Sequence, residues 1–96
     1  MEVLYPIQTM DKNLDQQRKR ILFRAHRRGT KESDMVIGGF AKAFVVGLNS
    51  AQLDRFEALL DQNDPDVLGW VIGIDAPPEK FNTDVLEMIK NFKNEL

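Results

Sequence analysis

Cysteine is absent from the 96-residue sequence, which excludes disulfide bonds, thiolate nucleophiles and metal sites built on cysteine. Metal sites in general need clustered ligands, and the acidic residues are scattered along the chain. No hydrophobic run approaches the roughly 20 residues that a membrane-spanning helix needs. The first residues also lack the basic and apolar blocks of a signal peptide. These absences favour a small cytoplasmic protein that folds without disulfides or metal ions.

Charge is distributed unevenly along the chain, although the formal net charge is only −2. Residues 12–31 contain eight Lys and Arg but one acid, which gives +7. Residues 32–96 contain five Lys and Arg and twelve acids, which gives −7. This polarity predicts either a charged binding surface on one element or pairing between the two halves of the chain.

The hydrophobic pattern predicts an all-α protein: a single compact domain of about five short helices around a central apolar helix. Residues 1–12 show no periodic pattern and contain a proline, so we expect a flexible N-terminal arm and one helical domain over residues 13–96. The helices are expected at residues 14–28, 33–48, 50–60, 64–72 and 83–96. The second is apolar on nearly all sides, which predicts that neighbouring helices surround it.

Glycine and short polar residues set the predicted helix ends. Gly29 is placed to take a left-handed conformation and end the first helix. Ser33 or Asp34 would cap the second helix, because their side chains can accept from backbone N–H groups. Asn49 begins a capping-box pattern before the third helix. Asp64 would cap the fourth helix, with a proline in its first turn.

Residues suited to catalysis are scarce. His26 is the only histidine, and a single helical histidine among arginines is more often a surface or boundary residue. The Gly38-Gly39 pair lies within a predicted helix rather than in a phosphate-binding loop. We therefore expect no enzyme activity and no catalytic, metal-binding or cofactor-binding residue.

Binding is the function class that the residues favour. The first predicted helix contains six cations that could neutralise phosphates: Arg18, Lys19, Arg20, Arg24, Arg27 and Arg28. However, the sequence pI is about 5.3, and no aromatic platform accompanies these cations. Taken alone, the residues rank protein–protein binding first, a solvated structural face second and nucleic-acid binding third.

The stretch RRGTKESD, residues 27–34, carries a resemblance to a known family. It is similar to the Arg-Gly-x-x-Glu signature of the flavinylation factors of succinate dehydrogenase, also called the succinate dehydrogenase assembly factor 2 family. RKRILFRAHRRGTKESD, LDRFEALLDQNDPDVLGWVIG and TDVLEMIKNF resemble that family's pattern in order and spacing. The resemblance covers roughly residues 14–92. Two residues depart from the pattern: Ser33 stands where an apolar residue is common, and Gly69 where a bulkier one often stands.

The resemblance implies a five-helix assembly factor, or chaperone, rather than an enzyme. Such a factor binds the flavoprotein subunit of succinate dehydrogenase, or of fumarate reductase in bacteria, and promotes covalent attachment of FAD. The bond forms on a histidine of the client, so FAD belongs to the client and His26 is not the attachment site. We expect a cytoplasmic bacterial member that acts as a monomer in a transient complex, without nucleic acid. An antitoxin-like or nucleic-acid-binding small regulatory protein is the alternative.

The resemblance also implies where the partner binds. We expect six partner-binding residues: Arg24, Arg27, Arg28, Gly29, Glu32 and Asp34. Within the motif, Arg28 could form a forked contact with a client carboxylate, and Glu32 could accept from client donors. Gly29 could both end the helix and let a partner's backbone approach. The structural alternative is that Arg28 pairs with Glu32, or that Glu32 caps the second helix.

Overall fold

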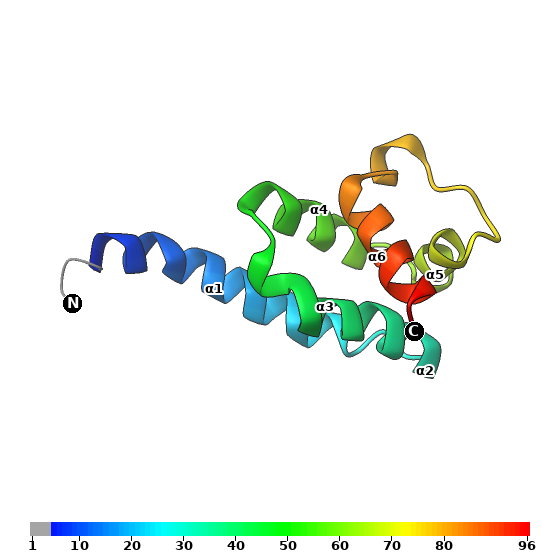
Figure 1. The fold of residues 1–96 in the computed structure, drawn as a ribbon, viewed down its shortest axis with the longest axis horizontal. Helices are drawn as coiled ribbons and strands as arrows, with labels where there is room; N and C mark the ends of the chain where they lie inside the picture. Colours follow the sequence, from blue (N-terminus) through cyan, green and yellow to red (C-terminus); the bar gives the residue numbers. More distant parts are fainter. Residues whose placement is uncertain (1–4) are drawn as a thin grey trace.

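The computed structural model describes residues 5–96, and its side chains from residue 13 onward (Figure 1). The described residues form helices and no strand, so the all-α prediction is confirmed. The α-helices are α1 (Tyr5–Ala25), α2 (Lys31–Ser33), α3 (Gly39–Phe44), α4 (Ser50–Leu60), α5 (Asp64–Ile72) and α6 (Asp84–Asn94). A π-helical turn covers Asp34–Gly38, and 3-10 turns cover Val45–Gly47 and Glu79–Phe81.

α1 begins at Tyr5, which is earlier than the predicted domain boundary at residue 13. Pro6 lies in the first turn, where the N–H that proline lacks would have no helical partner. Figure 1 shows the first half of α1 extending past all the other helices. The part of the predicted arm at residues 1–4 lies outside the described residues, and the division at residue 12 stays a prediction.

The second predicted helix is present but begins at a different cap. α2, the π-helical turn, α3 and the 3-10 turn at Val45–Gly47 follow one another without a break. The N-cap is Thr30, whose hydroxyl accepts from the Ser33 amide at 3.1 Å, so the predicted caps Ser33 and Asp34 were wrong. Thr30 has an extended backbone, which directs its hydroxyl at the first free N–H groups of the helix.

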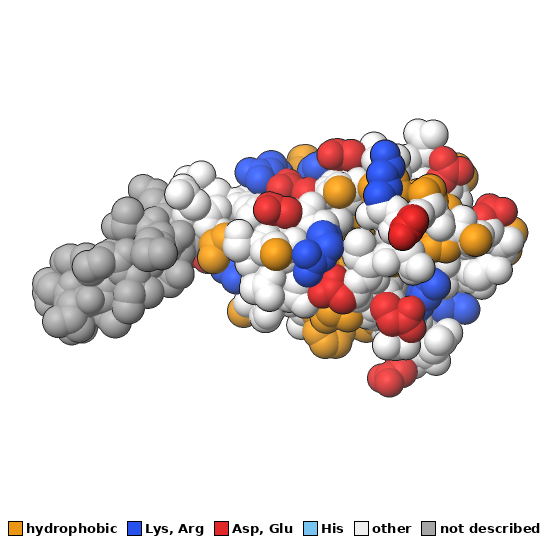
Figure 2. Space-filling view, turned by 90° about the horizontal axis from the view of Figure 1, so that it is seen from above, with side chains coloured by type: hydrophobic (Ala, Val, Ile, Leu, Met, Phe, Trp, Pro, Cys, Tyr) orange, Lys and Arg blue, Asp and Glu red, His pale blue; other side chains and the backbone are white. Residues whose placement is uncertain are grey.

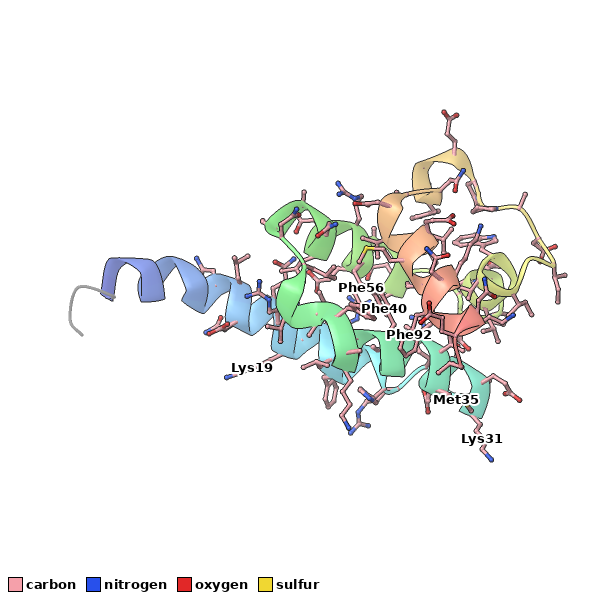
Figure 3. The ribbon with its side chains drawn as sticks, in the orientation of Figure 1. Lys19, Lys31, Met35, Phe40, Phe56 and Phe92 are labelled. Atoms are coloured by element: carbon pink, nitrogen blue, oxygen red, sulfur yellow. The ribbon has the colours of Figure 1, made fainter. Side chains whose placement is uncertain are left out.

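Phe40 lies at the centre of the core and is fully buried. Its ring centroid is 5.5 Å from that of Phe56 on α4 and 6.0 Å from that of Phe92 on α6. Figure 3 shows these three labelled side chains gathered between the helices. Since burial of one large apolar side chain contributes roughly 1.5–3 kcal/mol, this contact ties α3, α4 and α6 together.

Several apolar side chains that the pattern placed inside are exposed. The second helical segment is packed on one side rather than surrounded, because Met35, Phe44 and Val46 are 51%, 43% and 77% exposed. Ile72 and Leu96, at the ends of the fourth and fifth predicted helices, are also exposed. Ile72 is the last residue of α5, and Leu96 lies beyond the end of α6, so neither is followed by a turn that could cover it.

Candidate functional site

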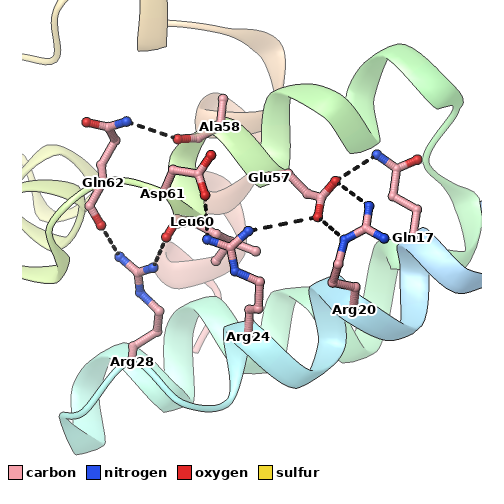
Figure 4. A network of polar contacts seen from close by, with 9 residues as sticks. All are labelled: Gln17, Arg20, Arg24, Arg28, Glu57, Ala58, Leu60, Asp61 and Gln62. Carbon is pink, nitrogen blue, oxygen red and sulfur yellow. Dashed lines mark hydrogen bonds and ion pairs between the residues drawn. The ribbon is translucent and has the colours of Figure 1, made fainter.

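Arg20 and Arg24 of α1 face the acidic residues of α4 (Figure 4). Arg20 donates to Glu57 through Nε at 2.7 Å and Nη2 at 2.9 Å, and Gln17 donates to the same carboxylate at 3.0 Å. Arg24 donates to Asp61 at 2.5 Å, and its Nη1 lies 3.9 Å from Glu57. The uneven charge distribution predicted either a charged binding surface or pairing between the two halves of the chain. These contacts show that such pairing occurs here. Figure 2, viewed from above, shows charges of both signs interspersed rather than gathered by sign.

The pKa of Glu57 is lowered from its ordinary value, chiefly by the hydrogen bonds from Arg20. Partial burial of the carboxyl opposes this shift, while Gln17 and the charges of Arg20 and Arg24 add to it. The same hydrogen bonds raise the pKa of Arg20. Both partners are thereby held in their charged forms at neutral pH, which favours contact between α1 and α4.

Arg28, the first residue of the motif, points into the protein. Its side chain is 7% exposed, and Nε donates to Asp64 Oδ1 at 2.9 Å. Its Nη1 and Nη2 donate to the carbonyls of Leu60 and Gln62 at 2.7 Å and 3.0 Å. Arg28 thus makes a charge-assisted contact with a carboxylate of its own chain, through Nε alone, and not the predicted forked contact with a client carboxylate. Pairing with Glu32 does not occur.

Asp64 connects the motif to the start of α5. Asn63 takes the N-cap position that we predicted for Asp64, so the Asp64 carboxylate is available for other donors. Ser33, which is fully buried, donates to the same Oδ1 that accepts from Arg28. This contact explains the departure of Ser33 from the apolar family pattern, because its hydroxyl has a buried partner. The sequence did not reveal these contacts, since the partners lie 31 and 36 residues away.

Gly29 and Glu32 face solvent at the turn between α1 and α2. Gly29 has φ +104°, which confirms the predicted left-handed conformation, and a Cβ there would have no atom within 4 Å. Asp34 supports the turn by accepting from the Arg28 amide at 3.2 Å. Glu32 lies in the first turn of α2, whose N-cap is Thr30, so Glu32 is not the cap. The turn therefore presents an open glycine beside an exposed carboxylate.

The six predicted partner-binding residues fall into two groups. Arg24, Arg28 and Asp34 make contacts within the chain. Arg27, Gly29 and Glu32 are exposed, and the Arg27 guanidinium lies 4.3 Å from the centroid of the Phe23 ring. The second group is the more exposed of the two. Partner binding by these residues stays a prediction.

A small cavity opens between α3 and α6, with a volume of about 210 Å³. It is lined by Phe40, Phe44, Met88, Asn91, Phe92 and Glu95. Pockets for drug-sized ligands measure about 300–1,000 Å³, so this one is small for a dinucleotide, and its carboxylate would repel a pyrophosphate. Within residues 5–96 we find neither a group of three or more His, Cys, Asp or Glu that could hold a metal ion nor a helix long and apolar enough to cross a membrane.

Comparison with known proteins identifies a family that includes this turn. Residues 19–93 match the family model described as the flavinator of succinate dehydrogenase, and this range includes the Arg-Gly-x-x-Glu motif. The chain belongs to this family. The resemblance noted from the motif and its flanking blocks is thus confirmed.

Individual relatives agree with the family match. A protein of Acetobacter pasteurianus named FAD assembly factor SdhE is 35% identical over 82% of this chain and 73% of its own length. A mitochondrial succinate dehydrogenase assembly factor 2 of Dictyostelium discoideum is 33% identical over 81% of this chain and 55% of its own length. The corresponding protein of Danio rerio is 31% identical over 82% of this chain and 51% of its own length. The chain therefore spans little more than half the length of these mitochondrial relatives.

Proposed function

We propose that this protein is an assembly factor that binds the flavoprotein subunit of succinate dehydrogenase and promotes covalent attachment of FAD to it. The observation that carries the proposal is the family match over residues 19–93, with Gly29 and Glu32 of the motif exposed at a turn. Gly29 and Glu32 would contact the client. Arg28 would act indirectly, because its guanidinium fixes the turn from inside.

The mechanism follows from what each partner supplies. The client provides the histidine and the pocket, and the factor holds the client so that the histidine meets the flavin correctly. Correct positioning of reacting groups can lower a barrier by several kcal/mol. FAD stays with the client, and the small, acid-bearing cavity between α3 and α6 is poorly suited to it. On this proposal the factor is not itself the enzyme.

The alternative functions have less support. Arg20, Arg24 and Arg28 contact acidic residues of the same chain, so fewer cations are available for phosphates than the sequence suggested. Nothing in the described structure favours an antitoxin role. Fumarate reductase as a second client, a monomeric state and a cytoplasmic location all stay predictions.

A complementation assay tests the function. A strain that lacks the gene should contain the flavoprotein subunit but little covalent FAD, as measured by in-gel flavin fluorescence. The parent protein should restore the signal. Glu32→Gln, which keeps the shape and removes the charge, should restore less than about a tenth of it at matched protein level. Glu79→Gln, an exposed glutamate far along the chain, is the control and should restore it fully. Normal fluorescence in the deletion strain would refute the proposed function.

A further inference from the structure

α1 carries positive charges on two sides, and one side is neutralised within the chain. Arg20 and Arg24 of α1, and Arg28 just after it, pair with acids in α4, at its C-cap and in α5. In contrast, Lys19 and Arg27 take part in no ion pair with any residue from 13 to 96. Their charges are not used to hold the described fold together, so they are available for contact with another molecule.

Lys19 and Phe23 lie on one side of α1, because residues four positions apart share a side of a helix. Arg27 follows the end of α1 at Ala25, and its guanidinium lies 4.3 Å from the centroid of the Phe23 ring. Phe23 is 60% exposed, and the Arg27 guanidinium lies over its ring in a cation–π contact. Arg27 remains exposed, and its guanidinium N–H groups donate no hydrogen bond to a residue from 13 to 96. An arginine held in this way loses less freedom when it binds a carboxylate with two parallel hydrogen bonds.

The second helical segment extends this surface beside α1. A Cβ at Gly38 would lie 3.0 Å from the His26 ring and 3.2 Å from the Ala25 carbonyl, so this side of the segment packs on α1. Lys42 follows Gly38 by one turn on the same side, and it is exposed. A further exposed cation therefore lies on the side of the segment that faces α1.

The beginning of the segment adds a cation and an apolar side chain. Figure 3 shows Lys19 and Lys31 projecting from the same side of the molecule, the lower side in that view, with Met35 next to Lys31. Met35 is half exposed. We call the whole surface the cationic face, and it consists of Lys19, Phe23, Arg27, Lys31, Met35 and Lys42. Arginine, methionine and phenylalanine are enriched at protein interfaces, and the three lysines would lie at the polar rim of one.

We propose that the cationic face docks an acidic polypeptide segment, one with carboxylates on both sides of an apolar residue. This inference rests on the proposed function in one respect, because it assigns the segment to the flavoprotein client. Charge complementarity supports it, because the face has four cations and none of them forms an ion pair with a residue from 13 to 96. A nucleic acid would leave Phe23 and Met35 without an apolar partner. A membrane would require Phe23 to enter the lipid with a guanidinium stacked on it.

The first experiment does not depend on the client. Poly-L-glutamate is titrated into the ¹⁵N-labelled protein, and amide chemical shifts are followed by NMR. We expect the largest shifts at the cationic face and their loss in Lys19→Gln/Arg27→Gln/Lys42→Gln. The control Lys80→Gln/Lys90→Gln/Lys93→Gln removes the same charge elsewhere and should bind like the parent. Shifts spread over the whole surface, or no binding, would overturn the proposal, as would binding to phosphatidylserine vesicles or duplex DNA but not to poly-L-glutamate.

The second experiment measures binding to the flavoprotein subunit of succinate dehydrogenase. The triple variant of the cationic face should bind about tenfold or more weakly at low salt, mainly through slower association, and its affinity should depend less on salt. Phe23→Ala should weaken binding with little change in the salt dependence. If the client binds both triple variants equally, the client does not use this face and the proposal is wrong for it. If poly-L-glutamate binds the cationic face but the parent protein does not bind the client, the face still binds acidic chains. The proposed function is then wrong.

Discussion

At the scale of single residues, a substitution at Gly29 can distinguish a requirement for its backbone conformation from a requirement for space beside it. Its φ of +104° is unfavourable for any residue with a Cβ, whereas the space around it is open. Gly29→Ala should therefore destabilise the protein by about 1–2 kcal/mol through backbone strain alone, without a clash. The protein should still fold, since domains of this kind are stable by about 5–15 kcal/mol. Thermal and urea unfolding provide the measurement.

Gly47→Ala is the matched control for that substitution. Gly47 also has no atom within 4 Å of a built Cβ, but its φ is not positive. Alanine there should leave the stability unchanged or raise it by up to about 1 kcal/mol. Equal unfolding midpoints for the two variants would show that the conformation of Gly29 carries no cost.

At the scale of elements, the contact of Asp64 with Arg28 joins the α1–α2 turn to α5. Asp64→Asn removes the charge that balances a guanidinium with 7% exposure. Loss of one partner of a buried pair typically costs 3–5 kcal/mol, and because two carbonyls still accept from Arg28 we expect about 3 kcal/mol. Urea denaturation should show this difference. Asp66→Asn, an exposed change in the same helix, should shift stability by less than about 0.5 kcal/mol.

The lowered pKa of Glu57 predicts how the stability of the contact between α1 and α4 changes at acidic pH. Because its folded pKa is lowered, it stabilises the folded state above the ordinary glutamate pKa of about 4.3, and this contribution is lost as pH falls through the lower folded pKa. Glu57→Gln should be less stable than the parent by about 1 kcal/mol at pH 7. The difference should shrink between about pH 5 and pH 3 in melts recorded across that range. A constant difference would mean that the charge of Glu57 is not involved.

The elements themselves could largely be predicted from the sequence, and their side-chain partners could not. Helix positions, the capping box at Asn49 and the left-handed Gly29 depend on neighbouring residues, so local patterns reveal them. The inward orientation of Arg28 depends on Asp64 and on two carbonyls far along the chain. The pattern of apolar residues also overestimated burial at Met35, since periodicity shows which side is apolar but not what covers it.

At the scale of the whole molecule, the long α1 allows the predicted domain boundary at residue 13 to be tested by deletion. Its first half extends past the other helices in Figure 1. Removal of residues 2–12 should therefore lower the melting temperature by only a few degrees. Removal of residues 2–19 should be far more damaging, because Arg18 donates to the carbonyls of Val45 and Leu48 at 3.1 Å and 3.0 Å. A large loss of stability from the shorter deletion would place the boundary before residue 13.

The π-helical turn at Asp34–Gly38 has a consequence for how this protein tolerates changes in length. A single π turn amounts to one residue inserted into an α-helix, with α-helical register before and after it. Loss of one residue here would leave a continuous α-helix from α2 to α3, with Ser33 and Phe40 still directed at their partners. Loss of one residue within α4 would instead rotate everything after it by about 100°. Relatives that differ by a one-residue gap should therefore be more common at this turn than within α4.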